Sequence, residues 1–391
     1  MGEVVKEVTR NDPTSEAPIM MITANNGFIE QSERYAFDNA GESLKKYILL
    51  QKGELAYNHG ASKLRPFGSC FALTTAESAR IPFVYHCFSA ENKNAEFLSI
   101  ELNGSEVESQ LRKIVSSGAR MDGLLNISFD EYSTVTVLLP DIKEQEHIAD
   151  FFRNLDHLIT LHQRKYDKLQ VLKKAMLEKM FPKNGSSVPE IRFKGFTDAW
   201  EQRKLGEVVE RITRKNENLE STLPLTISAQ YGLIDQNEFF DKRIASKDVS
   251  GYFLVRNGEF AYNKSTSSDA PWGAIKRLDR YESGVLSTLY IVFKVLDERK
   301  TSSDYIVTYY NTDLWHKGIQ AIAAEGARNH GLLNVAPADF FETNLTMPKD
   351  YAEQQQIGSF FQMLDHLITL HQRELEKLQN IKKSMLEKMF V

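Results

Sequence analysis

Two short segments in each half of the chain carry side chains that could bind nucleic acid. The first segment follows a repeated Ala-Tyr-Asn. Its candidate residues are Asn58, His59, Ser62, Lys63 and Arg65, and then Asn263, Lys264, Ser265, Thr266, Ser267, Ser268 and Trp272. Amides and cations suit base edges in the major groove, and small hydroxyls suit phosphate oxygens. The alternative interpretation is a solvated turn after a strand.

The second segment combines glycine with arginine. It reads Gly118-Ala119-Arg120 in the first half and Gly326-Ala327-Arg328 in the second, where Asn329 and His330 follow. Glycine permits close approach of the backbone to a ligand, and the guanidinium fork matches phosphate or guanine. The alternative is a loop packed on its own domain, with the arginine paired to a carboxylate. Recurrence in both halves fits either interpretation.

Motifs that would indicate catalysis are missing from the sequence. It contains no Walker-type phosphate loop and no dinucleotide fingerprint. It also lacks the Asn/Asp-Pro-Pro-aromatic tetrapeptide of amino-methyltransferases, a metal-ligand spacing and a nucleophile elbow. The sequence therefore argues against an enzyme, and it predicts no cofactor and no metal bound to this chain.

Composition and charge limit the classes of protein further. The 391 residues allow two to four domains, and 42% hydrophobic content is ordinary for a globular protein. No apolar run reaches the roughly 18 residues of a membrane span, and the two cysteines favour a reduced cytoplasmic compartment. Residues 1–140 carry 13 basic and 18 acidic groups, and residues 204–348 carry 17 and 19. Neither segment has the basic footprint of a protein that grips DNA alone.

A repeated helix is expected to position these segments. Residues 144–181 recur as residues 353–390, with 26 of 38 positions identical. Apolar residues fall close to a heptad seam in both copies. The seam comprises Ile148, Phe152, Leu155, Ile159, His162, Tyr166, Leu169, Leu172, Met176 and Met180, and then Ile357, Phe361, Leu364, Ile368, His371, Leu375, Leu378, Ile381, Met385 and Met389. An antiparallel pair is favoured, because it buries both seams and treats two like halves equivalently.

The ends of the helices and two seam residues carry further signals. Asp141 and Asp350 stand three residues before a glutamate, as in a capping box, and Pro182 ends the first copy. His162 and His371 are interpreted as polar residues that fix the register of the pair. The alternative for them is a pH or metal site.

The segments between the helices predict two α+β globules. Short runs rich in β-branched and aromatic residues, such as Tyr290–Val295 and Thr134–Pro140, predict strands. Ser105–Ser116 and Ser303–Ala323 predict helices. The expected domains are a globule over 1–140, a helix over 141–181, a linker over 182–203, a globule over 204–349 and a helix over 350–391.

The doubled order of motifs resembles the specificity subunit of type I restriction–modification systems, usually called HsdS. Each half has Gly-Ala-Arg-x-x-Gly-Leu-Leu-Asn, then a proline, Glu-Gln and a long helix. These are Gly118–Asn126, Pro140, Glu144-Gln145 and Ile148–Met180, and then Gly326–Asn334, Pro348, Glu353-Gln354 and Ile357–Met389. Pro189–Val208 is also typical of that family. The family usually has such a passage before its first Gly-Glu-Val, whereas this chain begins at Met1, which favours a truncated or reassigned start.

The resemblance implies two target recognition domains, each reading one half of a split, asymmetric site in double-stranded DNA. It implies that the helices set the unread gap and dock two methyltransferase subunits. Restriction and motor subunits would complete the complex, and S-adenosylmethionine, ATP and Mg²⁺ would belong to those partners. The alternative function is a duplicated scaffold that binds proteins and does not read DNA. The acidic charge favours that alternative slightly, and divergent halves with fixed spacers disfavour it.

Overall fold

The computed structural model of the chain describes residues 1–24, 26–34, 41–115, 124–183, 185–228, 231–241, 244–323 and 331–389. The chain divides into two compact units. Unit 1 comprises Met1–Gln163 and Gln372–Val391, and unit 2 comprises Arg164–His371. The division falls inside the two long helices, α4 (Ile142–Lys179) and α9 (Tyr351–Met389), so the segment boundaries expected from sequence stay predictions.

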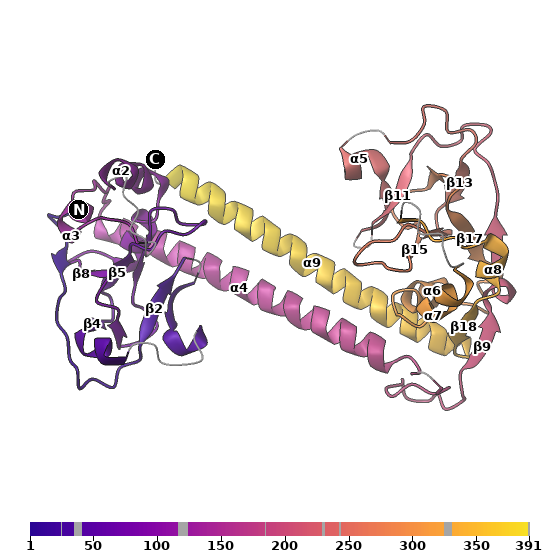
Figure 1. Ribbon diagram of the computed structural model, residues 1–391, viewed down its shortest axis with the longest axis horizontal. Helices are drawn as coiled ribbons and strands as arrows, with labels where there is room; N and C mark the ends of the chain where they lie inside the picture. The colour runs from indigo at the N-terminus through magenta and orange to yellow at the C-terminus, as the bar shows by residue number, and fades with distance from the viewer. Residues whose placement is uncertain are drawn as a thin grey trace. The chain divides into compact units, whose positions relative to one another are not determined.

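Unit 1 is built on an antiparallel four-stranded sheet of order β1-β8-β5-β6, of which β5 and β8 are labelled in Figure 1. Its strands are β1 (Lys6–Glu7), β5 (Leu55–Asn58), β6 (Ser69–Ala72) and β8 (His86–Ser89). Two hairpin-like pairs add β2 (Met20–Thr23) with β3 (Gly27–Glu30), and β4 (Ile48–Gln51) with β7 (Ser78–Ile81). The helical elements are η1 (Gln31–Glu33), η2 (Gly41–Lys46), α1 (Ala95–Glu101), α2 (Ser105–Ile114) and α3 (Phe129–Ser133).

Unit 2 repeats this topology with the sheet order β10-β17-β14-β15. Its strands are β10 (Val209–Ile212), β14 (Phe260–Asn263), β15 (Ala274–Arg277) and β17 (Ile291–Val295). The paired strands are β11 (Leu225–Ser228) with β12 (Gly232–Asp235), and β13 (Phe253–Arg256) with β16 (Ser283–Leu286). Its helical elements are η3 (Leu205–Glu207), α5 (Gln236–Phe240), α6 (Ser303–Tyr309), α7 (His316–Ile322) and α8 (Pro337–Phe341). The predicted class of two pseudo-symmetric α+β units is confirmed.

Unit 2 also contains a strand pair that has no counterpart among the described residues of unit 1. Here β9 (Glu201–Lys204) runs antiparallel to β18 (Asn344–Met347). In unit 1 the corresponding stretch, Thr134–Pro140, forms no strand, so the strand predicted there is wrong. The physical reason is that a strand needs a partner, and no described segment of unit 1 takes the place of β9.

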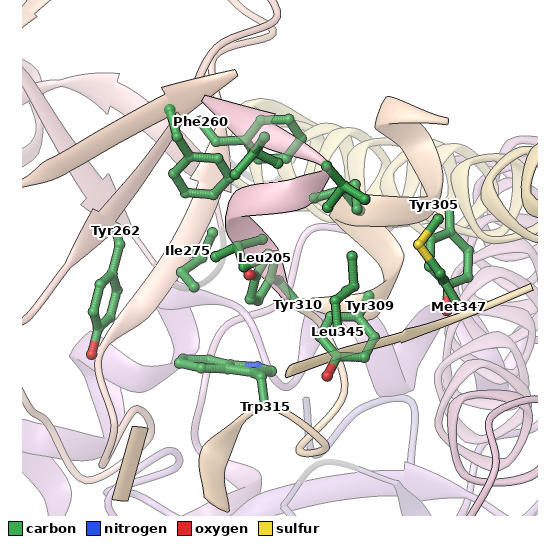
Figure 2. Packing of buried hydrophobic residues seen from close by; sticks show 14 of the residues in the cluster. Leu205, Phe260, Tyr262, Ile275, Tyr305, Tyr309, Tyr310, Trp315, Leu345 and Met347 are labelled. Carbon is green, nitrogen blue, oxygen red and sulfur yellow. The ribbon is translucent and has the colours of Figure 1, made fainter. Parts of the chain in front are cut away.

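Aromatic side chains fill the core of unit 2 between its sheet and its helices. Figure 2 shows the rings of Tyr262, Tyr309 and Trp315 gathered with Phe260 and Leu345. Tyr310 and Trp315 lie between α6 and α7 and are both buried. The helical structure predicted over Ser303–Ala323 consists of two short helices, and the turn between them directs both rings into the core.

The long helices pack together and run antiparallel. In unit 1, Lys382 on α9 binds Asp156 on α4, and in unit 2, Lys173 on α4 binds Asp365 on α9. Later residues of α4 therefore pair with earlier residues of α9, as expected for an antiparallel pair. Much of the predicted seam is buried, including Phe152, Leu155, Phe361, Leu364, Ile368 and Leu375. Leu172, Met385 and Met389 are exposed, contrary to the prediction, since a straight helix drifts from a heptad repeat by about 20° per heptad.

The predicted aspartate caps are confirmed at both helix starts. Asp141 Oδ1 accepts hydrogen bonds from the backbone amides of Lys143 and Glu144, both at 3.0 Å. Asp350 Oδ1 accepts from the amide of Ala352 at 2.8 Å. These bonds satisfy donors that the first turn of a helix leaves without partners.

Candidate nucleic-acid interface

The first candidate segment is a loop held shut by a tyrosine in both units. In unit 1 the loop joins β5 to β6, and the Tyr57 hydroxyl donates to the carbonyl of Phe67 at 2.6 Å. In unit 2 the loop joins β14 to β15, and the Tyr262 hydroxyl donates to the carbonyl of Trp272 at 2.8 Å. Each tyrosine therefore anchors the residue ten positions further on, which fixes the base of the loop on the sheet.

A glycine closes each loop directly after that anchored residue. Gly68 and Gly273 have φ of +82° and +78°, in the left-handed region that favours glycine. A Cβ at Gly68 would lie 2.6 Å from the carbonyl oxygen of Asn58, and one at Gly273 would lie 2.2 Å from that of Asn263. The sequence signal that reasoning from the residues missed is this aromatic-Gly pair, which recurs at the same distance from Ala-Tyr-Asn.

The two asparagines at the loop starts serve the loops themselves. The Asn58 Oδ1 accepts from the amide of Gly60 at 2.9 Å, and its Nδ2 donates to the carbonyl of Ile22 at 3.1 Å. The Asn263 Oδ1 accepts from the amide of Ser265 at 3.0 Å. These Asx turns orient the chain as it leaves the sheet.

His59 is buried in unit 1, with only 6% of its surface exposed. Its ring centroid lies 5.1 Å from that of His86, whose Nε2 is 3.0 Å from the carbonyl oxygen of Ile127. His59 thus belongs to the packing beneath the loop, and not to its exposed surface.

Exposed polar side chains occupy the tip of each loop. In unit 1, Ser62 and Lys63 are exposed. In unit 2 the exposed run is Ser265 to Asp269. Ser267 Oγ accepts from the amide of Ala270 at 3.1 Å and so stabilises a turn, while Trp272 packs against the core.

Two of the predicted cations lie further from the loop tips. Arg65 Nη1 donates to the carbonyl of Asn103 at 2.8 Å, and Arg65 lines a hollow beside Lys382 and Lys383 of α9. Lys264 Nζ lies 3.4 Å from the carbonyl oxygen of Val335. Burial lowers the pKa of both side chains from their ordinary values. Both therefore support the loop from within as well as carrying charge.

The described residues just after the second candidate segment contact the first loop in both units. Gly60 forms an isolated bridge with Leu124, and Ser265 forms the equivalent bridge with Leu332. In unit 2 the amide of Thr266 also donates to the carbonyl of Gly331 at 2.7 Å. Arg120, Arg328, Asn329 and His330 lie outside the described residues. The described residues that follow them in the chain are joined to the first loop in both units.

A glutamine ties each unit to its long helix, a role that the sequence did not reveal. Gln145 is buried, its Oε1 accepts from the amide of Asn94 at 3.0 Å, and its Nε2 donates to the carbonyl of Pro140 at 2.8 Å. Gln354 makes the same two bonds to Ser302 and Pro348, both at 2.9 Å. Asn94 and Ser302 are the N-cap residues of α1 and α6. The repeated Glu-Gln dipeptide could have indicated this role, but in the sequence it supported only the family resemblance.

Nothing in the described parts of either unit forms a metal site. Among those residues there is no group of three or more His, Cys, Asp or Glu side chains that could hold a metal ion. Likewise, no described helix is long and apolar enough to span a membrane.

No protein-family model matches the chain, and no curated protein sequence matches it. Solved structures do match over its whole length. The S subunit of a type I restriction–modification system from M. genitalium is 12% identical, with a TM-score of 0.57, over 100% of this chain and 94% of its own. This chain has the fold of a type I S subunit.

Two further structures match this chain from end to end. The HsdS subunit from Thermoanaerobacter tengcongensis is 14% identical, with a TM-score of 0.43, over 100% of this chain and 95% of its own. A chain from a structure of the type I R-M system is 15% identical, with a TM-score of 0.43, over 100% of this chain and 96% of its own. The match to the M. genitalium S subunit, with its TM-score of 0.57, confirms at the level of the fold the resemblance inferred from the motifs.

Proposed function

We propose that this chain is the DNA sequence-specificity subunit of a type I restriction–modification complex. Each unit reads one half of a bipartite, asymmetric site in double-stranded DNA. The observation that carries the proposal is the doubling of one architecture. Both units hold the same polar loop against a leucine, Leu124 or Leu332, that follows the second candidate segment in the sequence. Both are also joined to near-identical helices by the same glutamine contact.

The chemistry of the loops supports DNA contact by side chains of two kinds. The exposed hydroxyls of the unit 2 loop suit phosphate oxygens, and Lys63 at the tip of the unit 1 loop suits phosphates or guanine. The loop bases are rigid, since a tyrosine and a left-handed glycine fix each one. A rigid base with a variable tip lets the two units read different sequences from one scaffold.

In this proposal the chain is non-catalytic and works in the cytoplasm beside its DNA. Two methyltransferase subunits dock on the helices, and restriction and motor subunits join them. S-adenosylmethionine, ATP and Mg²⁺ are bound by those partners. The acidic charge of residues 1–140 and 204–348 supports this division of labour, because phosphate attraction must then come from the partners.

Exchanging one unit tests the proposal. Residues 1–140 are replaced by the same region of a relative with a different target, and the methylated sequences in the genome are determined. We expect one half-site to change and the other to stay as it was. A change in both half-sites, or in neither, would contradict the assignment of one unit to one half-site.

The helices are proposed to set the gap between the half-sites. Seven residues inserted near Arg164 lengthen α4 by about 10.5 Å, which corresponds to about three base pairs of B-DNA. Since α9 lacks a matching insertion, we expect the gap to grow by roughly one to three base pairs. An active variant that still methylates only sites with the original gap would show that the helices do not determine the spacing.

The acidic charge leaves a second candidate, a duplicated scaffold that binds proteins and not DNA. A gel-shift titration of the chain, with and without a methyltransferase subunit, separates the two. Specificity for DNA that appears only in the presence of the subunit supports the proposed role. If the assembled complex shows no sequence-specific shift, the scaffold is favoured.

A further inference from the structure

The first candidate loops of the two units are built on one frame. The distance in sequence from the anchoring tyrosine to the closing glycine is the same in both, from Tyr57 to Gly68 and from Tyr262 to Gly273. Between those ends, both loops have an asparagine, a serine, a proline and an aromatic residue at matching positions. These pairs are Asn58 and Asn263, Ser62 and Ser267, Pro66 and Pro271, and Phe67 and Trp272.

The shared serine closes a turn at the tip of each loop. In unit 1 the amide of Ser62 donates to the carbonyl of Arg65 at 3.0 Å, and the amide of Arg65 donates to Ser62 Oγ, also at 3.0 Å. In unit 2 the amide of Ser267 donates to the carbonyl of Ala270 at 3.1 Å, and the amide of Ala270 donates to Ser267 Oγ at 3.1 Å. Each turn therefore encloses two residues at the tip of its loop.

These two enclosed residues, called the tip pair, differ between the units. The tip pair is Lys63 and Leu64 in unit 1, and Ser268 and Asp269 in unit 2. All four side chains are exposed, and Leu64 leaves 62% of its surface in solvent. A constant frame that carries a variable, exposed tip is the arrangement expected of an element that reads a ligand.

Several other positions that differ between the loops are held within their own unit. His59 is buried, Arg65 Nη1 donates to the carbonyl of Asn103 at 2.8 Å, and Thr266 Oγ1 donates to the carbonyl of Gly331 at 3.1 Å. These side chains shape the loop from within. The tip pair therefore has the greatest freedom to determine what the loop contacts.

A carboxylate at the tip of a DNA-reading loop limits which groups that tip can contact. Phosphates repel the carboxylate of Asp269, so it binds DNA favourably only where it accepts a hydrogen bond from a base. In the major groove the base donors are N4 of cytosine and N6 of adenine. On adenine, N7 lies beside N6 and is an acceptor, which disfavours the second carboxylate oxygen. Cytosine is therefore the base that suits Asp269.

The tip pair of unit 1 combines a cation with an apolar side chain. The ammonium group of Lys63 matches O6 and N7 of guanine, which are both acceptors. The exposed side chain of Leu64 matches the methyl group of thymine, and contact between them removes apolar surface from water. The two tips thus suit different bases.

We propose that the tip pairs are the specificity-determining residues of the two units. Asp269 reads a cytosine in the half-site of unit 2, and Lys63 and Leu64 read a guanine and a thymine in the half-site of unit 1. This inference rests on the proposed function and deepens it, because it assigns bases to named residues.

Asp269→Asn tests the assignment in the chain assembled with its methyltransferase subunits. The two side chains have nearly the same shape, but an amide pairs with N6 and N7 of adenine. We expect one C·G pair of the unit 2 half-site to become A·T in the methylated sequences of the genome, while the unit 1 half-site stays the same. On duplexes that differ only at that pair, the wild type should prefer C·G at least about tenfold, and the variant should reverse the preference.

Two further variants control for charge and for transfer of the tip. Glu298→Gln removes a negative charge from an exposed residue after β17, at the edge of the sheet opposite to the loop, and should change neither half-site. Lys63→Ser combined with Leu64→Asp gives unit 1 the tip pair of unit 2, and should place a C·G pair in the unit 1 half-site. All variants should unfold at the wild-type temperature, because the exchanged side chains are exposed.

The outcomes separate this inference from the proposed function. A wild-type complex that methylates no bipartite site contradicts the proposed function, and this inference with it. If such a site is recognised, the inference alone is overturned by a unit 2 half-site without a C·G pair, or by an Asp269→Asn variant that keeps the wild-type preference. It is also overturned if Asp269→Asn weakens binding to all the duplexes equally, since that result would assign Asp269 to the shape of the loop.

Discussion

Lys173 Nζ lies 2.5 Å from Asp365 Oδ1, across the α4–α9 pair in unit 2. The two residues are not an isolated contact. The two copies of the helix are 209 positions apart, so Lys382 corresponds to Lys173 and Asp156 corresponds to Asp365. Lys382 and Asp156 form the equivalent bridge in unit 1, also at 2.5 Å. Two helices with nearly the same sequence make such reciprocal bridges when they run antiparallel.

Reversing this bridge should reveal how strongly it fixes the register. Asp365→Lys places two like charges together and should destabilise the chain by about 0.5 kcal/mol, in the range measured for partly exposed ion pairs. Adding Lys173→Asp should recover most of that loss. Urea unfolding of the single and double variants measures the coupling. Lys174→Asp, on an exposed neighbour, is the control that should show no recovery.

The loop-closing glycine of unit 2 should be intolerant of alanine. At Gly273 a Cβ would meet the Asn263 carbonyl, so Gly273→Ala should cost at least about 3 kcal/mol through strain and overlap together. Gly258 has a similar φ of +83° but no atom within 4 Å of its ideal Cβ. Gly258→Ala should therefore cost only the left-handed strain, about 1 kcal/mol. Thermal unfolding measures both losses of stability. If Gly273→Ala and Gly258→Ala lose the same stability, a small shift of the loop relieves the close approach at Gly273.

The ion pair between Arg192, which precedes β9, and the buried Glu353 should contribute strongly to stability. Arg192→Ala leaves the carboxylate of Glu353 buried without its counter-charge and should destabilise the protein by about 3–5 kcal/mol. Replacing both residues by methionine should restore most of the stability, since the desolvation cost disappears with the charge. The denaturant midpoints of the wild type and of these two variants test this prediction. A double variant as unstable as the single one would mean that packing, and not the buried charge, dominates here.

Both cysteines lie in unit 1 and should report its unfolding. Burial raises the pKa of the Cys70 thiol to about 12, and it raises that of Cys87 as well. Since the thiolate is the reactive form, native protein at pH 8 should react with a disulfide reagent far more slowly than unfolded protein. The free energy of unfolding should also fall as pH rises above the ordinary thiol pKa, because the folded chain then holds more protons than the unfolded one. Rapid labelling of native protein would contradict this burial.

The arginines of the second segment should contribute to DNA recognition. Arg120→Ala and Arg328→Ala should each weaken methylation by the assembled complex, with a lost base contact costing about 1–3 kcal/mol. Arg112→Ala serves as the control, because that exposed side chain pairs with Glu108 on the same helix. Full activity of both loop variants at limiting enzyme would assign these loops a structural role.

Sequence reasoning succeeded where the signal was local and repeated. The long repeated helices, the capping aspartates and the strand at Tyr290–Val295 all have a physical cause within a few residues, and the structure confirms each of them. Reasoning failed where the deciding partner was distant. Thr134–Pro140 has a strand-like composition but lacks a neighbour to pair with. His59 was expected on a binding loop, whereas its burial depends on His86, which is far along the chain.

The candidate site was predicted in part for the same reason. Residue types at a loop tip can be read from sequence, and Ser62 and Lys63 are indeed exposed. The bridge between the first loop and the leucine that follows the second segment could not be predicted, because it depends on pairing between Gly60 and Leu124, or between Ser265 and Leu332, which are far apart in the sequence. In the sequence, the only indication of this bridge is that both segments recur in the same order in the two halves.

The glutamine joint has a consequence for how such proteins diversify. Gln145 and Gln354 each bind a backbone amide on the globule, and the side chain at that position is asparagine in one unit and serine in the other. A hydrogen bond to a backbone amide does not require a particular side chain on the residue that donates it. Mutation can therefore rewrite most of a globule, or recombination within the two near-identical helix-coding stretches can replace it entirely, while the new globule still fits the old connector.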